Sequence, residues 1–317
     1  MPKHLVVGAG SVGTAVACLL AGQGNDVVVV SRSGSGPGGP GIRLEAADAA
    51  SGPRMAELAR GAAAIYNCVN PPYQRWVTDW PPIARSLLEA AERSGAVLVT
   101  VGNLYGYGEV DGPMTEDLPL TPRGPKGRVR AQVWRDARDA QQAGRVRATE
   151  VRGSDYLAPG AGSHLGDRVM PRVLHGRPVR LLPSVDQPHT WTSVDDVAGL
   201  LVAVAADERA WGRPWHVPSN APRTQREAVT DLARAAGYDE ITVREHPAWL
   251  LRAMALTNPL LRELAEVAYQ FERPFVLDST AAQRTFGLAP TPWETVVERQ
   301  VAHYRRAADR RGGTGPG

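Results

Sequence analysis

Three glycines near the start of the chain have the spacing of a phosphate-binding turn. The string GAGSVG places Gly8, Gly10 and Gly13 between an apolar run and a helical segment that begins at Ser11 and Val12. The first glycine permits a tight turn, the second lets the backbone approach a pyrophosphate, and the third lets helix and strand pack closely. The helix N-terminus would face the negative charge. The pattern predicts a dinucleotide site; the alternative is an ordinary glycine-rich turn.

The residues after the second apolar run bear on which dinucleotide binds. NAD sites usually place a carboxylate about 20 residues after the glycines, where it holds the ribose 2′-hydroxyl. This chain has Ser31, Arg32 and Ser33 there. A guanidinium and two hydroxyls suit a 2′-phosphate. We therefore expect NADP, with NAD as the second candidate; the alternative is that Arg32 is simply exposed at a strand end.

Lysine usage singles out one residue for proton chemistry. The chain has 36 basic residues, of which only Lys3 and Lys126 are lysines. Where a positive charge alone suffices, this sequence uses arginine. A lysine retained at position 126 therefore indicates chemistry that needs a compact ammonium whose pKa burial can lower. Chance retention is the alternative.

The elements that must position these residues alternate along the first half of the chain. Continuous apolar runs predict strands buried on both faces of a parallel sheet. They lie at residues 4–8, 26–31, 63–69, 97–101 and 146–151, with helical stretches at 12–20, 76–93 and 129–143. The order predicts an α/β fold, namely a Rossmann-type doubly wound parallel sheet with a smaller C-terminal α/β substrate lobe.

We expect three parts along the chain. Residues 1–152 would form an NAD(P)-binding Rossmann domain, and residues 153–304 a substrate-binding lobe interleaved with the sheet around 185–220. Helical segments are predicted in this lobe at 194–206, 223–236, 247–269 and 292–308. A lobe over the carboxyl edge of the sheet would cover the place where such folds bind ligands. Residues 305–317 lack apolar periodicity and are expected to form a disordered tail.

Composition and absent motifs exclude several classes of function. The arginines are spread through every segment rather than gathered into a basic stripe, so we expect no nucleic-acid partner. No apolar run approaches the ~20 residues of a membrane span, and no secretion signal precedes the first strand. Cys18 and Cys68 are expected to be reduced core thiols of a cytoplasmic protein. No GxxxxGK[ST], HExxH, paired CxxC or GxSxG motif occurs. We therefore expect no metal, and the sequence does not support a kinase, a zinc hydrolase or a serine hydrolase.

Further motifs resemble those of extended short-chain dehydrogenases/reductases. Besides GAGSVG they are the pair Asp48 and Ala49, NLYGYG at 103–108, TEDLPLTP at 115–122, VRGSDYLAPG at 151–160 and SVDDVA at 193–198. More narrowly, the chain resembles the NAD-dependent epimerase/dehydratase family, from about His4 to Tyr304. As a set the motifs are specific for the fold and much less so for the reaction.

The resemblance implies roles for particular residues. Asp48 would contact the adenine, and Val69, Asn70 and Pro71 would line the cofactor after the fourth strand. Ser154, Asp155 and Tyr156 would lie near the nicotinamide. The substrate would face residues 154–162, 189–192 and Arg273, among them Ser154, Tyr156, His189 and Trp191. His164 is a further candidate for contact with the substrate. Each also has a plainer interpretation, such as Asp48 as a turn residue and Trp191 as core.

The chain departs from the family where proton transfer takes place. The family uses a Ser or Thr before a VYG-like element and a Tyr-x-x-x-Lys helix. Here Val101 stands at the Ser position beside Thr100, and the helix reads GPKGRVRAQVW, without tyrosine. In one register Lys126 takes the Tyr place and Arg130 the Lys place. In the other, Lys126 is the lysine and Pro122 stands where Tyr should be.

Other side chains could replace the missing proton donor. Tyr105 and Tyr107 follow the fifth strand, and a phenol there near Lys126 could exchange a proton with a carbonyl or hydroxyl. Asn103 could orient a substrate oxygen, and His164 or His189 could act as base. Structural roles for Tyr105 and for both histidines are the alternatives.

We therefore expect an NADP-dependent oxidoreductase or epimerase/dehydratase-like enzyme with a non-standard active site. It would act on a small carbonyl or hydroxyl substrate, with Lys126 or Tyr105 moving the proton. The alternatives are a redox-neutral lyase, isomerase or cyclase, and a non-catalytic NADP-binding sensor. By the resemblance, a homodimer would form through the helices at 76–93 and 129–143.

Overall fold

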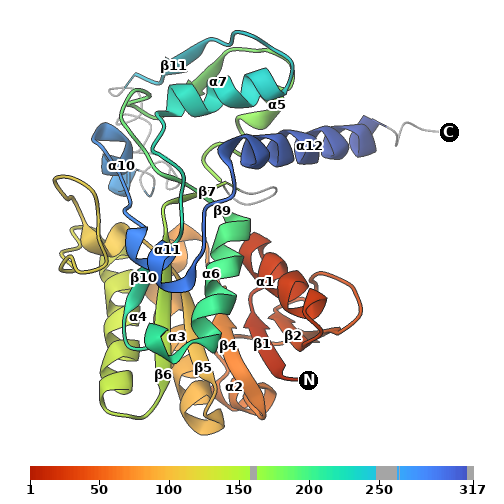
Figure 1. Ribbon diagram of the computed structural model, residues 1–317, viewed down its shortest axis with the longest axis vertical. Helices are drawn as coiled ribbons and strands as arrows, with labels where there is room; N and C mark the ends of the chain where they lie inside the picture. The colour runs from red at the N-terminus through yellow and green to blue at the C-terminus, as the bar shows by residue number, and fades with distance from the viewer. Residues whose placement is uncertain (158–162, 248–262, 264, 313–317) are drawn as a thin grey trace.

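A single parallel sheet organises the larger part of the chain. The computed structural model describes residues 1–157, 163–247, 263 and 265–312. Seven strands lie in the order β10-β6-β5-β4-β1-β2-β3, and every neighbouring pair is parallel (Figure 1). Their bounds are β1 Lys3–Val7, β2 Asp26–Ser31, β3 Ile42–Ala46, β4 Ala62–Asn67, β5 Val97–Asn103, β6 Arg147–Gly153 and β10 Pro214–His216. The predicted Rossmann-type fold class is confirmed.

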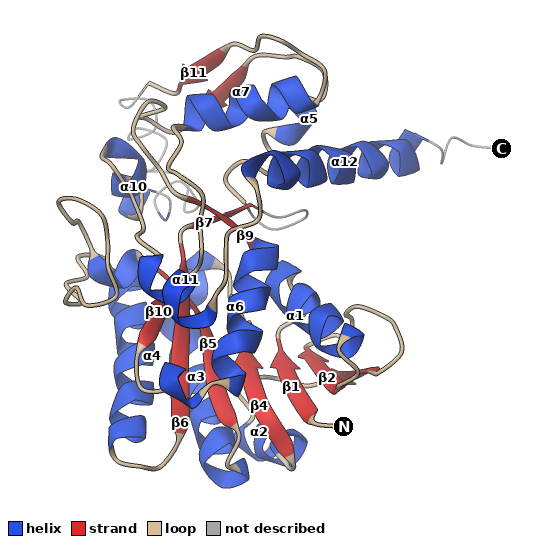
Figure 2. Ribbon diagram, viewed as in Figure 1, coloured by secondary structure: helices blue, strands red, loops and turns tan. Residues whose placement is uncertain are grey.

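Helices cover both faces of the sheet. Helices α1 (Ser11–Gly22) and α6 (Val194–Ala206) lie on one face, and α2 (Gly52–Ala59), α3 (Trp76–Ser94) and α4 (Pro125–Gln142) on the other (Figure 2). The run DVVVVS shows why: Val27 and Val29 pack on the α1 and α6 side, whereas Val28 and Val30 pack on the opposite side. Alternating side chains of one apolar strand thus serve two cores.

The predicted elements agree best where apolar patterning is strongest. The strand at 26–31 and the helix at 194–206 have the bounds expected from sequence. Helix α4 begins at Pro125 rather than at residue 129, since proline suits the first turn of a helix, where its missing N–H costs nothing. This earlier start places Lys126 and Arg130 one turn apart on the same helix.

The C-terminal half adds a lobe over the carboxyl ends of the strands (Figure 1). Its elements are α5 (Met170–Val173), β8 (Val179–Leu181), α7 (Gln225–Ala235), β11 (Val243–Glu245), α10 (Tyr269–Glu272) and α12 (Trp293–Gly312), around a core of their own. Thr224 and Glu227 form a capping box that starts α7. Most of the helix predicted at 247–269 lies outside the described residues.

Two features of the second half differ from or refine the expectation. Helix α12 continues past Arg305, whose guanidinium donates to the Ala236 carbonyl at 2.8 Å, so residues 305–312 are helical rather than part of a tail. Strand β10 returns to the large sheet, as an interleaved lobe requires, and α11 (Thr280–Phe286) packs beside it. The short strands β7 (Asp155–Leu157) and β9 (Trp191–Ser193) pair in parallel where the two parts meet.

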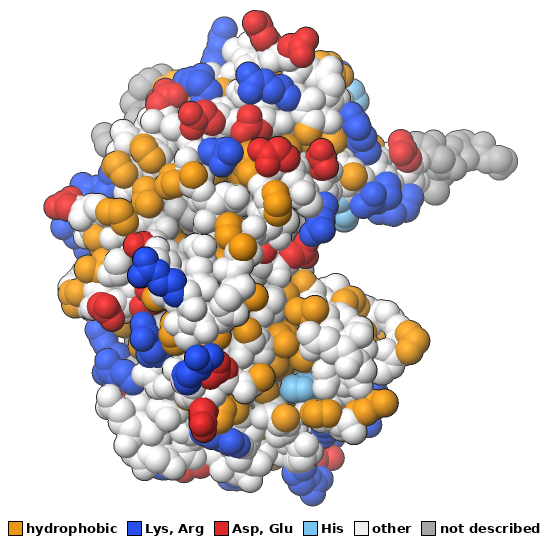
Figure 3. Space-filling view, in the orientation of Figure 1, with side chains coloured by type: hydrophobic (Ala, Val, Ile, Leu, Met, Phe, Trp, Pro, Cys, Tyr) orange, Lys and Arg blue, Asp and Glu red, His pale blue; other side chains and the backbone are white. Residues whose placement is uncertain are grey.

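The charged side chains are mixed on the surface, and the two cysteines differ in exposure. On the face in Figure 3, Lys and Arg side chains intermingle with Asp and Glu rather than forming one basic area. In the part of the chain that the structure describes, no helix has the length and apolar character needed to cross a membrane. Cys68 is buried as expected, but Cys18 is exposed, because it lies on the outer side of α1.

A buried polar network joins β6 and β10 to the loop after β5. The His216 Nδ1 faces the Asp278 carbonyl oxygen at 2.8 Å, so this nitrogen carries the proton. Its Nε2 therefore accepts from the Tyr107 hydroxyl at 2.8 Å, while that oxygen accepts from Arg152 at 2.7 Å. Glu150 in turn accepts from Arg152 at 2.7 Å. Burial lowers the pKa of His216 to about 4, which keeps the ring neutral.

This network makes stability depend on pH. The pKa of His216 lies below the ordinary 6.5, so its contribution is complete above pH 6.5 and is lost as the pH falls toward 4. We expect protonation of the unfolded chain at this histidine to lower the free energy of unfolding by about 2 kcal/mol between pH 6.5 and pH 5. Urea unfolding at several pH values should give a shallower pH dependence for His216→Gln than for the wild type. The control His175→Gln should follow the wild type; a His216→Gln slope equal to that of the wild type contradicts the assignment.

Candidate cofactor and active site

Two of the three glycines in the turn after β1 leave no room for a side chain. Gly8 adopts φ 106°, and a Cβ there would lie 2.6 Å from the Cys68 carbonyl oxygen. A Cβ on Gly13 would lie 1.8 Å from the Gly8 carbonyl oxygen, so α1 touches the turn directly. A Cβ on Gly10, by contrast, would meet nothing within 4 Å. The first and third glycines therefore close the turn, and the second faces open space.

The N-terminus of α1 points into that space, and no side chain in the described part of the chain caps it. Gly10 caps the helix, no side chain supplies a capping hydrogen bond, and the first turn has no acidic residue. The free N–H groups and the helix dipole thus favour an anion.

Two cavities meet at this turn. The outer one is about 530 Å³ and the inner one about 330 Å³. Both are lined by Gly10, Cys68, Val69 and Asn70. Of the residues singled out from sequence, the outer cavity also has Gly8, Ser31, Arg32, Ser33, Asp48 and Pro71, and the inner one Ser11, Val12, Asn103, Tyr105, Arg130, Ser154 and Tyr156. An extended ligand with its middle at Gly10 would reach both.

The outer cavity presents a free guanidinium. Among the described residues, Arg32 makes no hydrogen bond or ion pair, and it is exposed. The serines beside it shape the loop, because the Ser31 hydroxyl donates to the Ser35 carbonyl and the Ser33 hydroxyl meets that of Ser35, each at 2.7 Å. Asp48 accepts from the Ala50 N–H at 3.0 Å, as a turn residue does, while also lining the cavity.

The inner cavity is walled by phenols and indoles. The hydroxyls of Tyr105 and Tyr73 lie 2.9 Å apart, and Trp76 donates to the Pro71 carbonyl at 2.8 Å. Burial raises the pKa of Tyr105 well above 10 and that of Tyr73 to about 12. Both side chains therefore stay protonated. The Tyr156 hydroxyl donates to the Gly102 carbonyl at 2.6 Å.

Buried polar atoms without partners face the same cavity. The Ser154 hydroxyl, the Ser163 hydroxyl and the Arg130 Nε have no hydrogen-bond partner among the described residues, and all three residues line the inner cavity. Arg130 also lies over the Trp80 ring at 4.5 Å and donates to the Val101 carbonyl. Since buried polar groups are rarely left unpaired, these atoms indicate a polar ligand.

Lys126 does not line either cavity. Its side chain is 1% exposed and its ammonium binds the carboxylates of Glu263 and Glu266, the second at 2.7 Å. Glu266 also accepts the backbone N–H of Lys126 at 2.7 Å, at the start of α4. The ammonium is held away from the cavities because two carboxylates, about 140 residues away in sequence, bind it.

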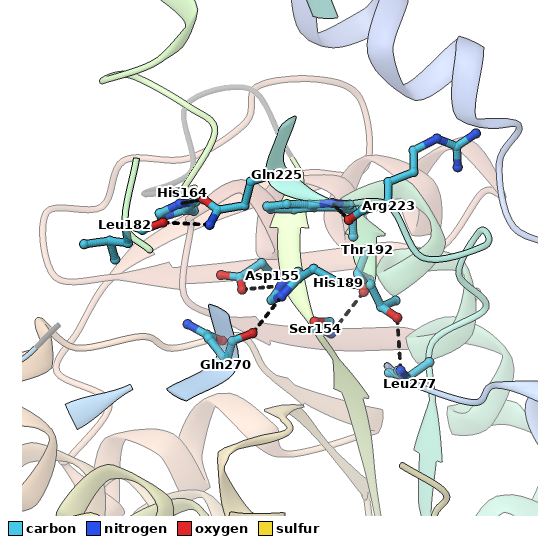
Figure 4. A network of polar contacts seen from close by, with 12 residues as sticks. Ser154, Asp155, His164, Leu182, His189, Thr192, Arg223, Gln225, Gln270 and Leu277 are labelled. Atoms are coloured by element: carbon cyan, nitrogen blue, oxygen red, sulfur yellow. Dashed lines mark hydrogen bonds and ion pairs between the residues drawn. The ribbon is translucent and has the colours of Figure 1, made fainter. Parts of the chain in front are cut away.

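The remaining predicted side chains lie behind the cavity walls. Tyr107 belongs to the network with His216 and Arg152. His189 contacts Asp155, and His164 binds the Gln225 side chain at 2.6 Å (Figure 4). Trp191 packs in the lobe core and donates to the Arg223 carbonyl at 3.0 Å. Of the hydrogen-bond partners named in this paragraph, only Asp155 lines the inner cavity. The resemblance placed Asp155 near the nicotinamide.

Three aromatic residues of the inner cavity were not expected from sequence. They are Tyr73, Trp76 and Trp80, at the 3₁₀ turn η1 (Tyr73–Arg75) and the start of α3. Their spacing of three and four residues places them on one side of a helix, which is the signal that could have identified them.

Comparisons with known proteins give the same architecture. The model of the NAD dependent epimerase/dehydratase family matches residues 4–217, more than half of the chain. No curated protein matches it in sequence. Among solved structures, a UDP-glucose 4-epimerase from Thermotoga maritima with UDP-glucose has a TM-score of 0.78 at 17% identity, covering 96% of this chain and 99% of that one. A dTDP-glucose 4,6-dehydratase from Streptomyces venezuelae, with NAD bound, has 0.77 at 22%, covering 99% of each. At these identities the likeness shows the fold.

The contact between α1 and the turn predicts a pair of opposite mutant effects. Gly13→Ala would place a methyl group 1.8 Å from the Gly8 oxygen, so the turn or the helix must move. We expect the free energy of unfolding to fall by at least about 1–3 kcal/mol. Gly22→Ala, on the same helix with nothing within 4 Å, should leave stability unchanged or raise it by about 0.5–1 kcal/mol. Urea unfolding measures both, and equal stability of the two variants would argue against the contact.

Proposed function

The chain belongs to the NAD-dependent epimerase/dehydratase family, and we propose that it is an NADP-dependent enzyme acting on a small carbonyl or hydroxyl substrate. The observation that carries this proposal is the pair of cavities meeting at Gly10, with unpaired polar atoms at the inner end. The outer cavity suits the adenosine part of a dinucleotide and the inner cavity the nicotinamide and the substrate.

The residues present fit a dinucleotide. The open side of Gly10 and the uncapped N-terminus of α1 would hold the pyrophosphate, and Asp48, Val69, Asn70 and Pro71 would border the remainder. When bound, the nicotinamide supplies or accepts a hydride. The dehydratase from Streptomyces venezuelae, solved with NAD, supports a cofactor of this class.

The preference for NADP rests on Arg32. Its free guanidinium, with the hydroxyls of Ser31 and Ser33 nearby, offers charge and donors to a 2′-phosphate. An NAD site would instead present a carboxylate at this strand end.

At the inner end, the chain's own groups would orient the substrate. Tyr105 stays a neutral phenol and would donate a hydrogen bond to the substrate oxygen. Asn103 accepts from the Tyr105 N–H at 3.2 Å and so holds the loop that carries this phenol. Arg130 would add positive charge near the reacting oxygen. For Lys126 we propose a positioning role, because its ammonium is already bound by two carboxylates.

We also propose a homodimer in the cytoplasm. A groove of about 840 Å³ runs between α3 and α4 and is lined in part by Val77, Pro81, Leu88 and Val129, with Val77 57% exposed. Exposed apolar side chains in a groove favour association. Sedimentation as a monomer at micromolar concentration would contradict this assembly.

The cofactor preference can be tested without knowing the substrate. Titration calorimetry should show that Arg32→Gln weakens NADP⁺ binding about ten- to a hundredfold, because a charged hydrogen bond to the phosphate is lost, and leaves NAD⁺ binding unchanged. Arg60→Gln, an exposed arginine outside both cavities, is the control. Equal losses for both cofactors would count against a phosphate at Arg32, and no binding of either would end the enzyme proposal.

The reaction type needs a turnover assay. We expect the protein to consume NADPH, measured by nicotinamide absorbance, with at least one member of a panel of aldehydes and ketones. Product formation without net consumption of NADPH would favour the redox-neutral alternative, an epimerase or dehydratase.

A further inference from the structure

Asp155 stands at the junction of the sheet and the lobe, facing the inner cavity. It begins β7 directly after β6 ends, and its side chain is 17% exposed. The cavity that it lines also contains Gly10, Tyr105 and Arg130. One carboxylate oxygen lies 2.8 Å from the Nε2 of His189, as the dashed line in Figure 4 shows. The carboxylate is thus bound from behind while remaining accessible from the cavity.

The His189 ring is held in place from several sides. It is 1% exposed, and it stacks on Phe271 and Phe275 with centroids 4.9 and 5.4 Å apart. Its Nδ1 lies 3.1 Å from the Gln270 carbonyl oxygen, the second dashed line from this ring in Figure 4. The ring therefore connects a backbone acceptor to a carboxylate.

These two contacts determine how many protons the pair holds. A carbonyl oxygen can only accept, so the Nδ1 of His189 carries a hydrogen. The 2.8 Å contact between Nε2 and Asp155 then needs one more, on either the nitrogen or the carboxyl oxygen. Without it, a lone pair would face a carboxylate. A pair in which both contacts are hydrogen bonds therefore holds one proton more than a neutral imidazole and a free carboxylate.

The other titratable groups facing Asp155 are less able to exchange a proton. They are Tyr73, Tyr105, Tyr269 and His164. Burial raises the pKa of each tyrosine above 10, and the charge of Asp155 raises it further. Burial lowers the pKa of His164. Its Nε2 donates to the Gln225 oxygen, since the Gln225 nitrogen already donates to the Leu182 and Ser184 carbonyls.

We propose that Asp155 and His189 form the acid–base unit of this site, in place of the Tyr-x-x-x-Lys pair that α4 lacks. The inference rests on the proposed function. In carbonyl reduction, a bound reduced nicotinamide would supply hydride to the carbonyl carbon. As the C=O π pair moves to oxygen, that oxygen would take the proton held by Asp155 and His189. The pair is left as carboxylate and neutral imidazole, and regains a proton from water. Alcohol oxidation runs the same steps in reverse.

Nitrogen NMR of the histidine side chains tests the stored proton without any substrate. In the wild type at neutral pH, the His189 ring should give the signals of a doubly protonated or proton-sharing imidazole. In Asp155→Asn it should become a neutral ring with hydrogen on Nδ1 alone. His189→Gln serves to assign the His189 signals, because they are absent from its spectrum. A wild-type His189 ring that carries hydrogen on Nδ1 alone overturns the proposal, whatever the activity.

Kinetics test the transfer, using the carbonyl compound of the panel that the wild type reduces with NADPH. Asp155→Asn and His189→Gln should lower kcat by about 10²–10⁴-fold and remove the proton-dependent limb of the kcat–pH profile. Their NADP⁺ affinity should stay near that of the control Asp239→Asn, an exposed carboxylate. A purely structural pair would change Tm while the pH profile stays intact.

Wild-type kcat and an unchanged pH profile in a folded Asp155→Asn overturn the proposal. If the wild type reduces no carbonyl at all, the reaction type assigned above fails, whereas the NMR result still decides whether the pair holds its proton.

Discussion

The close contact between Gly13 of α1 and the Gly8 carbonyl is the constraint on which the binding architecture depends. Because no side chain separates helix and turn, the N-terminus of α1 lies at the carboxyl edge of the sheet, and no side chain of the described residues caps it. The two cavities meet at this point and share Gly10. A parallel sheet brings the carboxyl ends of its strands to one edge. The contact between Gly13 and the Gly8 carbonyl places the N-terminus of α1 at that edge, where it favours an anion.

The parts of the fold that follow from sequence are those with strong local patterns. The run DVVVVS and the helix at 194–206 were predicted with their observed bounds, because one apolar stretch serves two cores and a helix has a fixed period. The glycine turn and residues 31–33 of the outer cavity followed from spacing, whereas Asp48, Val69, Asn70 and Pro71 followed from the family resemblance. The inner cavity was only partly predictable, because its walls combine η1 and α3 with the end of β6, and such contacts leave no local pattern.

Lys126 shows most clearly what cannot be predicted from sequence spacing. Its rarity among basic residues and its place on α4 indicated chemistry, but spacing along a chain does not reveal which distant groups a side chain meets. Glu263 and Glu266 bind its ammonium from across the fold, and Arg130 one turn later lies in the cavity instead. Conversely, no spacing joins Asp155 to His189, which are brought together because β7 and β9 pair beside one another. The sheet half thus contributes the glycine turn, and the seam with the lobe contributes the Asp155–His189 pair.

The contrast between the two thiols has a practical consequence. Burial raises the pKa of Cys68 to about 12, so its reactive thiolate is scarce, and its backbone forms part of the wall shared by both cavities. Cys18 is exposed on the outer side of α1. A maleimide fluorophore would therefore attach at one defined position, on the helix whose other end borders both cavities, and would report a ligand bound there without engineered cysteines.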